Sequence, residues 1–259
     1  MVLDSNASQV DFPYEWVITK DQSYTLKSKA ENTEWMHSLH GAYSESQFIY
    51  GDALRLALSE FVKAEISSKK IKIMSMGLGL GYVELIAVFE CLKSNQPFEI
   101  VSYELDLQLQ DLFKFNCEQG LKYILNLKST DSNIETHFLS FFMKDYGYEI
   151  LRQGFDCILD LQNSVILKQA LTKTEIINNE QKFNVIFYDA FSSKTQSELW
   201  SDEFLNEFIL KFSDQDFCVF ATYAKVGELK RALKSNNFKF IEKKGFAYKH
   251  ESCLAIRRI

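Results

Sequence analysis

The sequence has few residues that interrupt or crosslink a chain. Only two of its 259 residues are proline, and no glycine- or serine-rich linker divides it. Its five cysteines are scattered and include no Cys-x-x-Cys pair, which argues against a disulfide framework and favours reduced core residues. The four histidines show no metal-ligand spacing, so no metal site is expected. With 46% hydrophobic residues, the chain is long enough for one globular domain with a sizeable core.

Long apolar runs are absent too. No stretch approaches the roughly 18 residues that a membrane-spanning helix needs. The opening segment MVLDSNASQVDF lacks the basic patch and apolar stretch of a secretory signal. We therefore expect a cytoplasmic protein with no membrane partner.

Charge is unevenly distributed. The net charge of −6 by itself argues against a nucleic-acid partner. Residues 225–259, however, carry ten Lys or Arg against three Glu, so this segment is +7 and the remainder is −13. An acidic body with a basic C-terminal segment is able to hold a polyanion on that segment alone, although ordinary solvated charge gives the same pattern.

Hydrophobic patterns predict alternating strands and helices, which favour a mostly parallel α/β sheet with crossover helices. Residues 14–28 read as a β-hairpin, and residues 239–259 as a terminal hairpin that gives the sheet an antiparallel edge. We expect an N-terminal hairpin and helical extension over residues 1–60 and a Rossmann-like domain over 61–259. The intervening strands are predicted at residues 71–76, 98–106, 164–171, 183–191 and 217–224.

A glycine loop follows the first of these strands. Gly77, Gly79 and Gly81 have the spacing G-x-G-x-G, and Tyr82 stands where the dinucleotide pattern requires glycine. The spacing is similar to the first motif of class I methyltransferases, which bind S-adenosylmethionine (SAM). Glu104 ends the next strand, where a carboxylate accepts hydrogen bonds from ribose hydroxyls. Loop, strand and terminal acid together predict a SAM or nucleotide site.

Several segments resemble one family in order along the chain. They are ITKDQSYTL, HSLHGAYSESQFIYGDAL, MGLGLG, VSYELD, YDAFSSKTQSELW and KRALKSNNFKFIEKKGFAYKHESCLA. They resemble the methyltransferase domain of the bacterial tRNA 5-methylaminomethyl-2-thiouridine biosynthesis proteins (MnmC-like). In bifunctional members an FAD-dependent oxidase domain follows, and we expect this chain to be the stand-alone methyltransferase half.

The resemblance implies a reaction and several residue roles. Methyl transfer from SAM to 5-aminomethyl-(2-thio)uridine at the wobble position of tRNA is the implied activity, with the anticodon region of tRNA as partner. Glu45 falls in the segment that folds over the cofactor pocket, and Asp189 matches the acid at the tip of the fourth strand. The family's Gly-Asp after the third strand is absent from ILKQALTKTE.

Asp189 is the candidate catalytic residue, because a carboxylate beside the cofactor orients an amine and receives its proton. A loop cap is the alternative role for such an Asp. Aromatic side chains stack on unpaired bases and lysines contact phosphates, which gives a set of candidate substrate-binding residues. The set comprises Tyr188, Phe191, Lys243, Lys244 and Lys249.

Two other functions fit the same pattern. An aminopropyltransferase of polyamine synthesis also has an N-terminal hairpin, a SAM-type fold and a strand-tip Asp, although its usual Gly-Gly-Gly-Asp loop is missing here. A non-catalytic protein that binds SAM or tRNA with the same fold is the third possibility.

Overall fold

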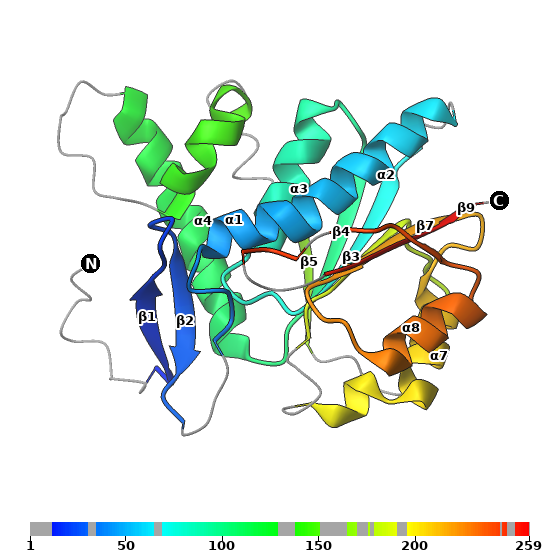
Figure 1. The fold of residues 1–259 in the computed structure, drawn as a ribbon. Helices are drawn as coiled ribbons and strands as arrows, with labels where there is room; N and C mark the ends of the chain where they lie inside the picture. The colour runs from blue at the N-terminus through cyan, green and yellow to red at the C-terminus, as the bar shows by residue number, and fades with distance from the viewer. Residues whose placement is uncertain are drawn as a thin grey trace.

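The computed structural model describes the chain with several gaps (Figure 1). The described residues are 12–30, 35–64, 69–128, 138–150, 165–169, 176, 179–190, 196–243, 245–247 and 252–258.

A seven-stranded sheet forms the centre of the fold, in the order β5-β4-β3-β6-β7-β9-β8. The strands from β5 to β7 pair in parallel, and β9 pairs antiparallel with both β7 and β8. The predicted mostly parallel sheet with an antiparallel C-terminal edge is therefore confirmed. The strands are β3 (Ile71–Met76), β4 (Phe98–Tyr103), β5 (Val165–Lys168), β6 (Val185–Tyr188), β7 (Phe217–Thr222), β8 (Lys239–Phe240) and β9 (Cys253–Arg258).

Helices cover both faces of this sheet, which explains why most residues of its central strands are apolar. In β3, Ile71 and Ile73 belong to one buried cluster and Met74 and Met76 to another, as the alternation of side chains in a strand requires. The first cluster includes residues of α2 (Asp52–Lys63), α3 (Tyr82–Lys93) and α4 (Leu107–Lys128). The second includes residues of α7 (Asp202–Phe212) and α8 (Gly227–Ser235).

The sequence SELWSDEFLNEFILKFS, residues 197–213, has a pattern that predicts one helix, but the structure divides this segment. A 3₁₀ helix, η3 (Ser197–Trp200), ends where Ser201 takes an extended conformation with a ψ of 148°. The Ser201 hydroxyl then accepts a hydrogen bond from the Phe204 N–H and caps α7. A serine in a helical pattern is a better cap than interior residue, which is the reason for the break.

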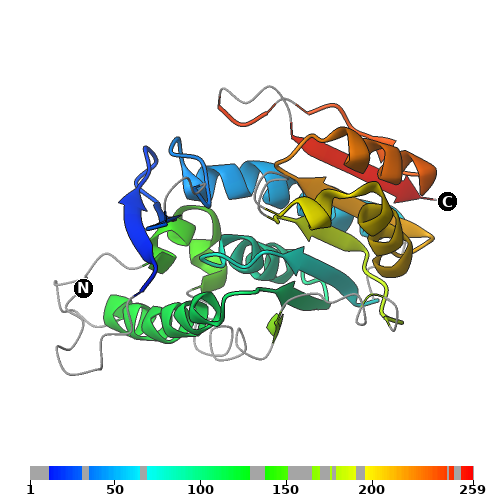
Figure 2. The ribbon, with the colours of Figure 1, turned by 90° about the horizontal axis from the view of Figure 1, so that it is seen from below.

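The N-terminal segment adds a two-stranded antiparallel hairpin, β1 (Tyr14–Ile18) and β2 (Tyr24–Ser28), as predicted. Figures 1 and 2 show this hairpin at one end of the molecule, far from α8. After it, α1 (Ala42–Ser46), the π-helical turn η1 (Gln47–Gly51) and α2 follow one another without a break.

The predicted boundary at residue 60 lies inside α2. Leu54 and Phe61 of this helix are buried in the same cluster as Ile73 of β3. The Phe61 ring also packs edge-on against Phe217 of β7, with 5.4 Å between the ring centroids. Helix α2 is thus part of the core that covers the sheet.

A half-buried carboxylate attaches the hairpin to α1. Asp21 accepts hydrogen bonds from the hydroxyls of Thr19 and Ser23, and from both the N–H and the hydroxyl of Ser44 in the first turn of α1. A Cβ on Gly41 would lie 2.5 Å from an Asp21 carboxylate oxygen, so the chain approaches Asp21 there because glycine has no side chain. Burial raises the pKa of Asp21, but the hydrogen bonds outweigh burial and hold this pKa below its usual value of 3.8.

Replacing Asp21 by Asn removes the charge and one of the two acceptor oxygens. We expect Asp21→Asn to lower the free energy of unfolding by about 2 kcal/mol at pH 7, the scale for hydrogen bonds to a charged group. Because the folded-state pKa is lowered, this contribution is present above pH 3.8 and is lost as pH falls through the folded-state pKa. Urea unfolding at a series of pH values tests both points.

Asp111→Asn is the matched control. Among the described residues, Asp111 pairs with Lys114 on the exposed surface of α4, at 3.2 Å, and its substitution should change stability by less than about 0.5 kcal/mol. Equal effects of the two substitutions at neutral pH would contradict a special role for Asp21.

Candidate cofactor and acceptor site

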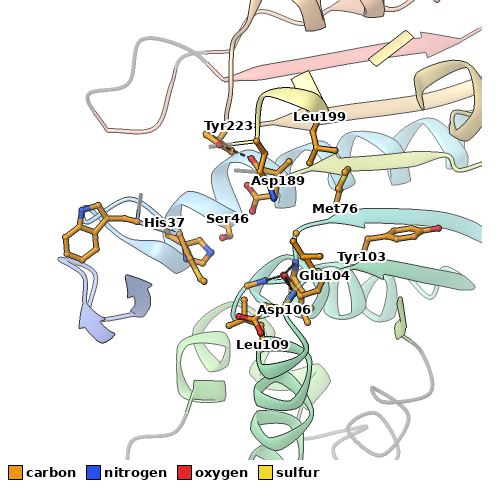
Figure 3. A pocket seen from close by; sticks show the side chains of 18 of the residues that line it. His37, Ser46, Met76, Tyr103, Glu104, Asp106, Leu109, Asp189, Leu199 and Tyr223 are labelled. Atoms are coloured by element: carbon orange, nitrogen blue, oxygen red, sulfur yellow. Dashed lines mark hydrogen bonds between the residues drawn. The ribbon is translucent and has the colours of Figure 1, made fainter. Parts of the chain in front are cut away.

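A cavity of about 1320 Å³ opens at the carboxyl edge of the sheet, where β3, β4 and β6 end. The strand order reverses here, since the chain goes from β3 to β4 on one side and to β6 on the other. Ligands of open α/β sheets bind at such switch points. In Figure 3, side chains from the strand ends and from the N-terminal segment point toward one another around this space.

The three glycines have different structural roles. A Cβ on Gly77, where φ is 98°, would lie 2.5 Å from the Asp189 carbonyl oxygen, so a side chain would separate β3 from β6. A Cβ on Gly81 would collide with the Phe113 ring of α4, and Gly81 does not line the cavity. At Gly79 the nearest atoms to a Cβ are 3.9 Å away, on Met36 and His37 across the cavity. Gly79 is therefore the position that keeps cavity space open.

Glu104 lies at the end of β4 beside this loop. One carboxylate oxygen accepts hydrogen bonds from the Leu78 N–H at 3.0 Å and the Gly79 N–H at 3.2 Å. The other oxygen accepts from the Asp106 N–H at 2.9 Å. The carboxylate thus holds the glycine loop against the next strand and also borders the cavity.

Asp189 follows β6 and faces the same space (Figure 3). Its backbone N–H donates to the Met76 carbonyl at 2.8 Å, and its carboxylate accepts a 2.6 Å hydrogen bond from the Tyr50 hydroxyl. Burial, and then the Asp189 charge, raise the pKa of Tyr50 well above its usual value, so this hydroxyl keeps its proton and donates it. Tyr50 orients the acid.

Sequence reasoning missed Tyr50. The residue lies in η1, a π-helical turn, and such turns occur often at functional sites. No hydrophobic period reveals a π-helical turn, so the sequence had no signal that would place this hydroxyl beside Asp189.

The N-terminal segment supplies one wall of the cavity. Glu45 is 5% exposed, lines the cavity and accepts a 2.6 Å hydrogen bond from the Ser38 N–H. His37 also lines the cavity, and its Nδ1 lies 3.1 Å from the Thr25 hydroxyl of the hairpin. The segment predicted to fold over the pocket therefore lies there.

The cavity is lined by acids. Among the described residues that surround it, none is Lys or Arg. Such a lining favours a cationic occupant, because a phosphate group would be repelled from every side. The lining carboxylates are those of Glu45, Glu104, Asp106, Asp189 and Glu198.

Two predicted substrate contacts are used by the fold instead. Tyr188 has no exposed surface, donates a hydrogen bond to the Leu199 carbonyl and packs against Trp200 and Phe220. Its ring has no face available for a base, because β6 is covered by helices on both sides.

Lys243 is the second predicted substrate contact that the fold uses instead. Its ammonium donates to the Asp52 carboxylate at 2.7 Å and to the Phe48 carbonyl, and it lies 4.0 Å from the centroid of the Phe48 ring. These contacts attach the C-terminal segment to η1 and α2 rather than offer a charge to phosphate. Lys244, Lys249 and Phe191 lie outside the described residues.

Three comparisons relate the chain to known proteins. Residues 134–258 match the model of a family described as S-adenosyl-L-methionine-dependent methyltransferase. An uncharacterized protein of Methanocaldococcus jannaschii is 27% identical over 93% of this chain, and the match spans 59% of that protein's length. The structure of MnmC2 from Aquifex aeolicus has a TM-score of 0.62 at 21% identity, covering 93% of this chain and 70% of that one.

Residues 134–258 thus carry the sequence signature of SAM-dependent methyltransferases, and the fold of the chain is similar to that of MnmC2. This similarity in fold agrees with the predicted resemblance to the MnmC-like methyltransferase domain. Spermidine synthase from Thermotoga maritima is also similar, with a TM-score of 0.52 at 11% identity over 94% of this chain and 67% of that one. In the described part of the chain, no helix is both long and apolar enough to span a membrane.

The residues present fit SAM. Gly79 leaves space where a cofactor must approach the loop, and Glu104 places a carboxylate at the end of β4 for ribose hydroxyls. Gln169 lines the cavity just after β5, in the segment where the family's Gly-Asp is absent from this sequence. Its amide has both donors and an acceptor for the edge of an adenine ring.

Gly79→Asn tests the glycine loop. Asn tolerates the positive φ of 53° at this position, so the variant should fold while its side chain enters the cavity. We expect SAM affinity, measured by calorimetry, to fall by roughly 100-fold or more, about 2.7 kcal/mol, with a melting temperature close to that of the parent.

Gly77→Asn is the contrasting variant. Its Cβ would meet the Asp189 backbone, so it should lower the melting temperature as well as SAM affinity. Unchanged SAM affinity in folded Gly79→Asn would remove the loop from the cofactor site.

Proposed function

We propose that this methyltransferase transfers the methyl group of SAM to a primary amine, the aminomethyl group of 5-aminomethyl-(2-thio)uridine at the tRNA wobble position. The observation that supports an amine acceptor is the acid-lined cavity with Asp189 at its inner edge. The resemblance to MnmC-like proteins and the similarity to MnmC2 support the tRNA substrate.

The chemistry requires the amine to lose a proton and to face the methyl group. Bound SAM supplies a methyl group that its sulfonium already activates. An alkylammonium group entering the cavity is attracted by the Asp189 carboxylate, which then orients the amine and accepts its proton directly or through water. The Tyr50 hydroxyl fixes one Asp189 oxygen at 2.6 Å and leaves the carboxylate in one orientation.

The loop after β7 completes this part of the wall. The Tyr223 hydroxyl, which borders the cavity, donates a 2.9 Å hydrogen bond to the carbonyl of Ala190. The bond fixes the backbone immediately after Asp189. The hydroxyls of Tyr50 and Tyr223 therefore fix the Asp189 carboxylate and the backbone after it. A group that contacts an amine in one geometry must be held in place in this way.

Aminopropyl transfer is the second candidate function. The similarity to spermidine synthase favours it, and the acid-lined cavity would also accept a polyamine. A product assay with putrescine and decarboxylated SAM separates the two reactions. A protein that binds SAM or tRNA without turnover would show binding by calorimetry and no product in either assay.

Methyl transfer to tRNA of known modification state tests the proposed function. Bulk tRNA that carries aminomethyl-uridine but lacks its methyl group should accept one methyl per modified wobble position. Fully modified tRNA should accept none, because its amine is already methylated. Radiolabel from SAM followed by nucleoside analysis identifies the product, and labelling of another nucleoside would reject the wobble assignment.

Asp189→Asn tests the role of the carboxylate. This substitution keeps the size and the hydrogen bond from Tyr50 while it removes the negative charge. We expect kcat to fall roughly 100-fold or more, the scale for losing a general base, and SAM affinity to stay within a few-fold of the parent. The rate should recover at higher pH, since the free amine is then more abundant.

The two alternative roles of Asp189 give different results. An active variant with an unshifted pH profile would make Asp189 a loop cap, and loss of SAM binding would make it a cofactor ligand. Tyr50→Phe, which removes only the positioning hydrogen bond, should lower kcat less than Asp189→Asn does.

A further inference from the structure

The cavity is larger than one small ligand requires. Its volume of about 1320 Å³ exceeds the roughly 300–1,000 Å³ of a pocket for a single drug-sized molecule, so an acceptor has room beside SAM. Its lining follows the order of the strands, with Gln169 after β5, Glu104 after β4, Asp189 after β6 and Tyr223 after β7. Because the glycine loop and Glu104 fit the cofactor, the acceptor belongs at the end formed by Asp189 and Tyr223.

The 3₁₀ turn η3 supplies polar side chains at the acceptor end. Gln196, which precedes the turn as its N-cap, and Glu198 both line the cavity, as does Leu199. Figure 3 shows Leu199 beside Asp189, on the side of the cavity away from Glu104. Gln196 is half-buried and Glu198 is exposed. Neither of these two side chains forms a hydrogen bond or an ion pair with another residue that the structure describes.

Two core contacts hold this turn in place. The Tyr188 hydroxyl donates a 2.5 Å hydrogen bond to the Leu199 carbonyl. Trp200 is 3% exposed and packs edge-on against the Tyr188 ring, with 5.1 Å between the ring centroids. The extended Ser201 then separates the turn from α7. The turn is therefore fixed to β6, the strand that ends at the candidate catalytic acid.

The acidic lining restricts how a nucleotide enters the cavity. Carboxylates repel phosphates, so the RNA backbone stays outside while the base enters. Enzymes that modify a base in this way take it out of its stack and read its Watson–Crick edge inside the pocket. Next to the carbon that bears the aminomethyl group, uracil presents a carbonyl oxygen and then the N3–H group. Recognition of this edge requires one donor and one acceptor from the protein.

The two side chains of the turn have these capacities, since a glutamine amide donates through its NH₂ group and a carboxylate accepts. We propose that Glu198 accepts a hydrogen bond from the uracil N3–H and that Gln196 donates to the neighbouring carbonyl oxygen. The pair recognises the acceptor base while Asp189 holds its amine. This inference rests on the proposed function and names the part of the substrate that the segment SELW binds.

The test removes the N–H group from the ligand and the carboxylate from the protein. Two synthetic anticodon stem-loops carry 5-aminomethyluridine or its N3-methyl analogue at the wobble position. Their dissociation constants are measured for the parent, Glu198→Ala, Glu198→Gln and Gln196→Leu, together with methyl transfer. SAM affinity, measured by calorimetry, checks that each variant is folded. Glu203→Ala is the matched control, because Glu203 is exposed in the first turn of α7 and is not among the described residues that line the cavity.

The parent should bind the stem-loop with the N3–H group roughly 10-fold or more tightly than the N3-methyl analogue, the scale for a hydrogen bond to a charged group. Glu198→Ala should bind the two RNAs about equally, because it lacks the carboxylate that distinguishes them. Glu198→Gln should keep part of the preference, since its amide oxygen also accepts. Gln196→Leu should weaken the binding of both RNAs, and Glu203→Ala should keep the parent's preference.

Several results would overturn the inference. Equal binding of the two RNAs by the parent, or a preference that persists in Glu198→Ala, contradicts the contact with the N3–H group. If Glu198→Gln weakens the binding of both RNAs as much as Glu198→Ala does, the carboxylate contacts a positive charge instead. A parent that binds neither RNA reads no base.

Failure of the proposed function gives a different result. The parent would then bind the stem-loops without methylating aminomethyl-uridine. The ratio of the two dissociation constants would still decide whether Glu198 reads the base.

Discussion

The site depends on the close approach of two strand ends. The Asp189 N–H donates to the Met76 carbonyl at 2.8 Å, and the Asp189 carbonyl oxygen lies 2.5 Å from the position that a Cβ on Gly77 would take. This contact joins the glycine loop after β3 to the acid after β6 as one rigid unit. A side chain at Gly77 would move both, so cofactor and acceptor geometry share a single constraint. The adjacent Glu104 extends the unit to β4 through the N–H groups of Leu78 and Gly79.

A second set of contacts brings the N-terminal segment onto this unit. Asp21 fixes the hairpin to the start of α1, and the continuous run from α1 through η1 then places Glu45 and Tyr50 over the cavity. The Tyr50 hydroxyl reaches the Asp189 carboxylate from this run. Hairpin, helix and strand tip thus form a connected polar path. The N-terminal extension contributes directly to the wall of the site and to the orientation of its acid.

Charge is divided between the cavity and its rim. Carboxylates line the cavity, which suits the sulfonium of SAM and an amine acceptor. Four of the eight basic residues that the structure describes in the C-terminal segment pair with acids or donate to backbone carbonyls, namely Arg231, Lys243, Arg257 and Arg258.

The sequence by itself determined the sheet, the hairpin, the glycine loop and the strand-tip acids. These features depend on local period, on glycine spacing and on the rule that parallel strands end at one edge. Only the tertiary structure decided that Tyr188 is core, that Lys243 pairs with Asp52 and that Tyr50 contacts Asp189. Each depends on a partner many positions away in the chain. Local pattern describes an element's own faces, whereas contacts between elements follow from how those faces pack.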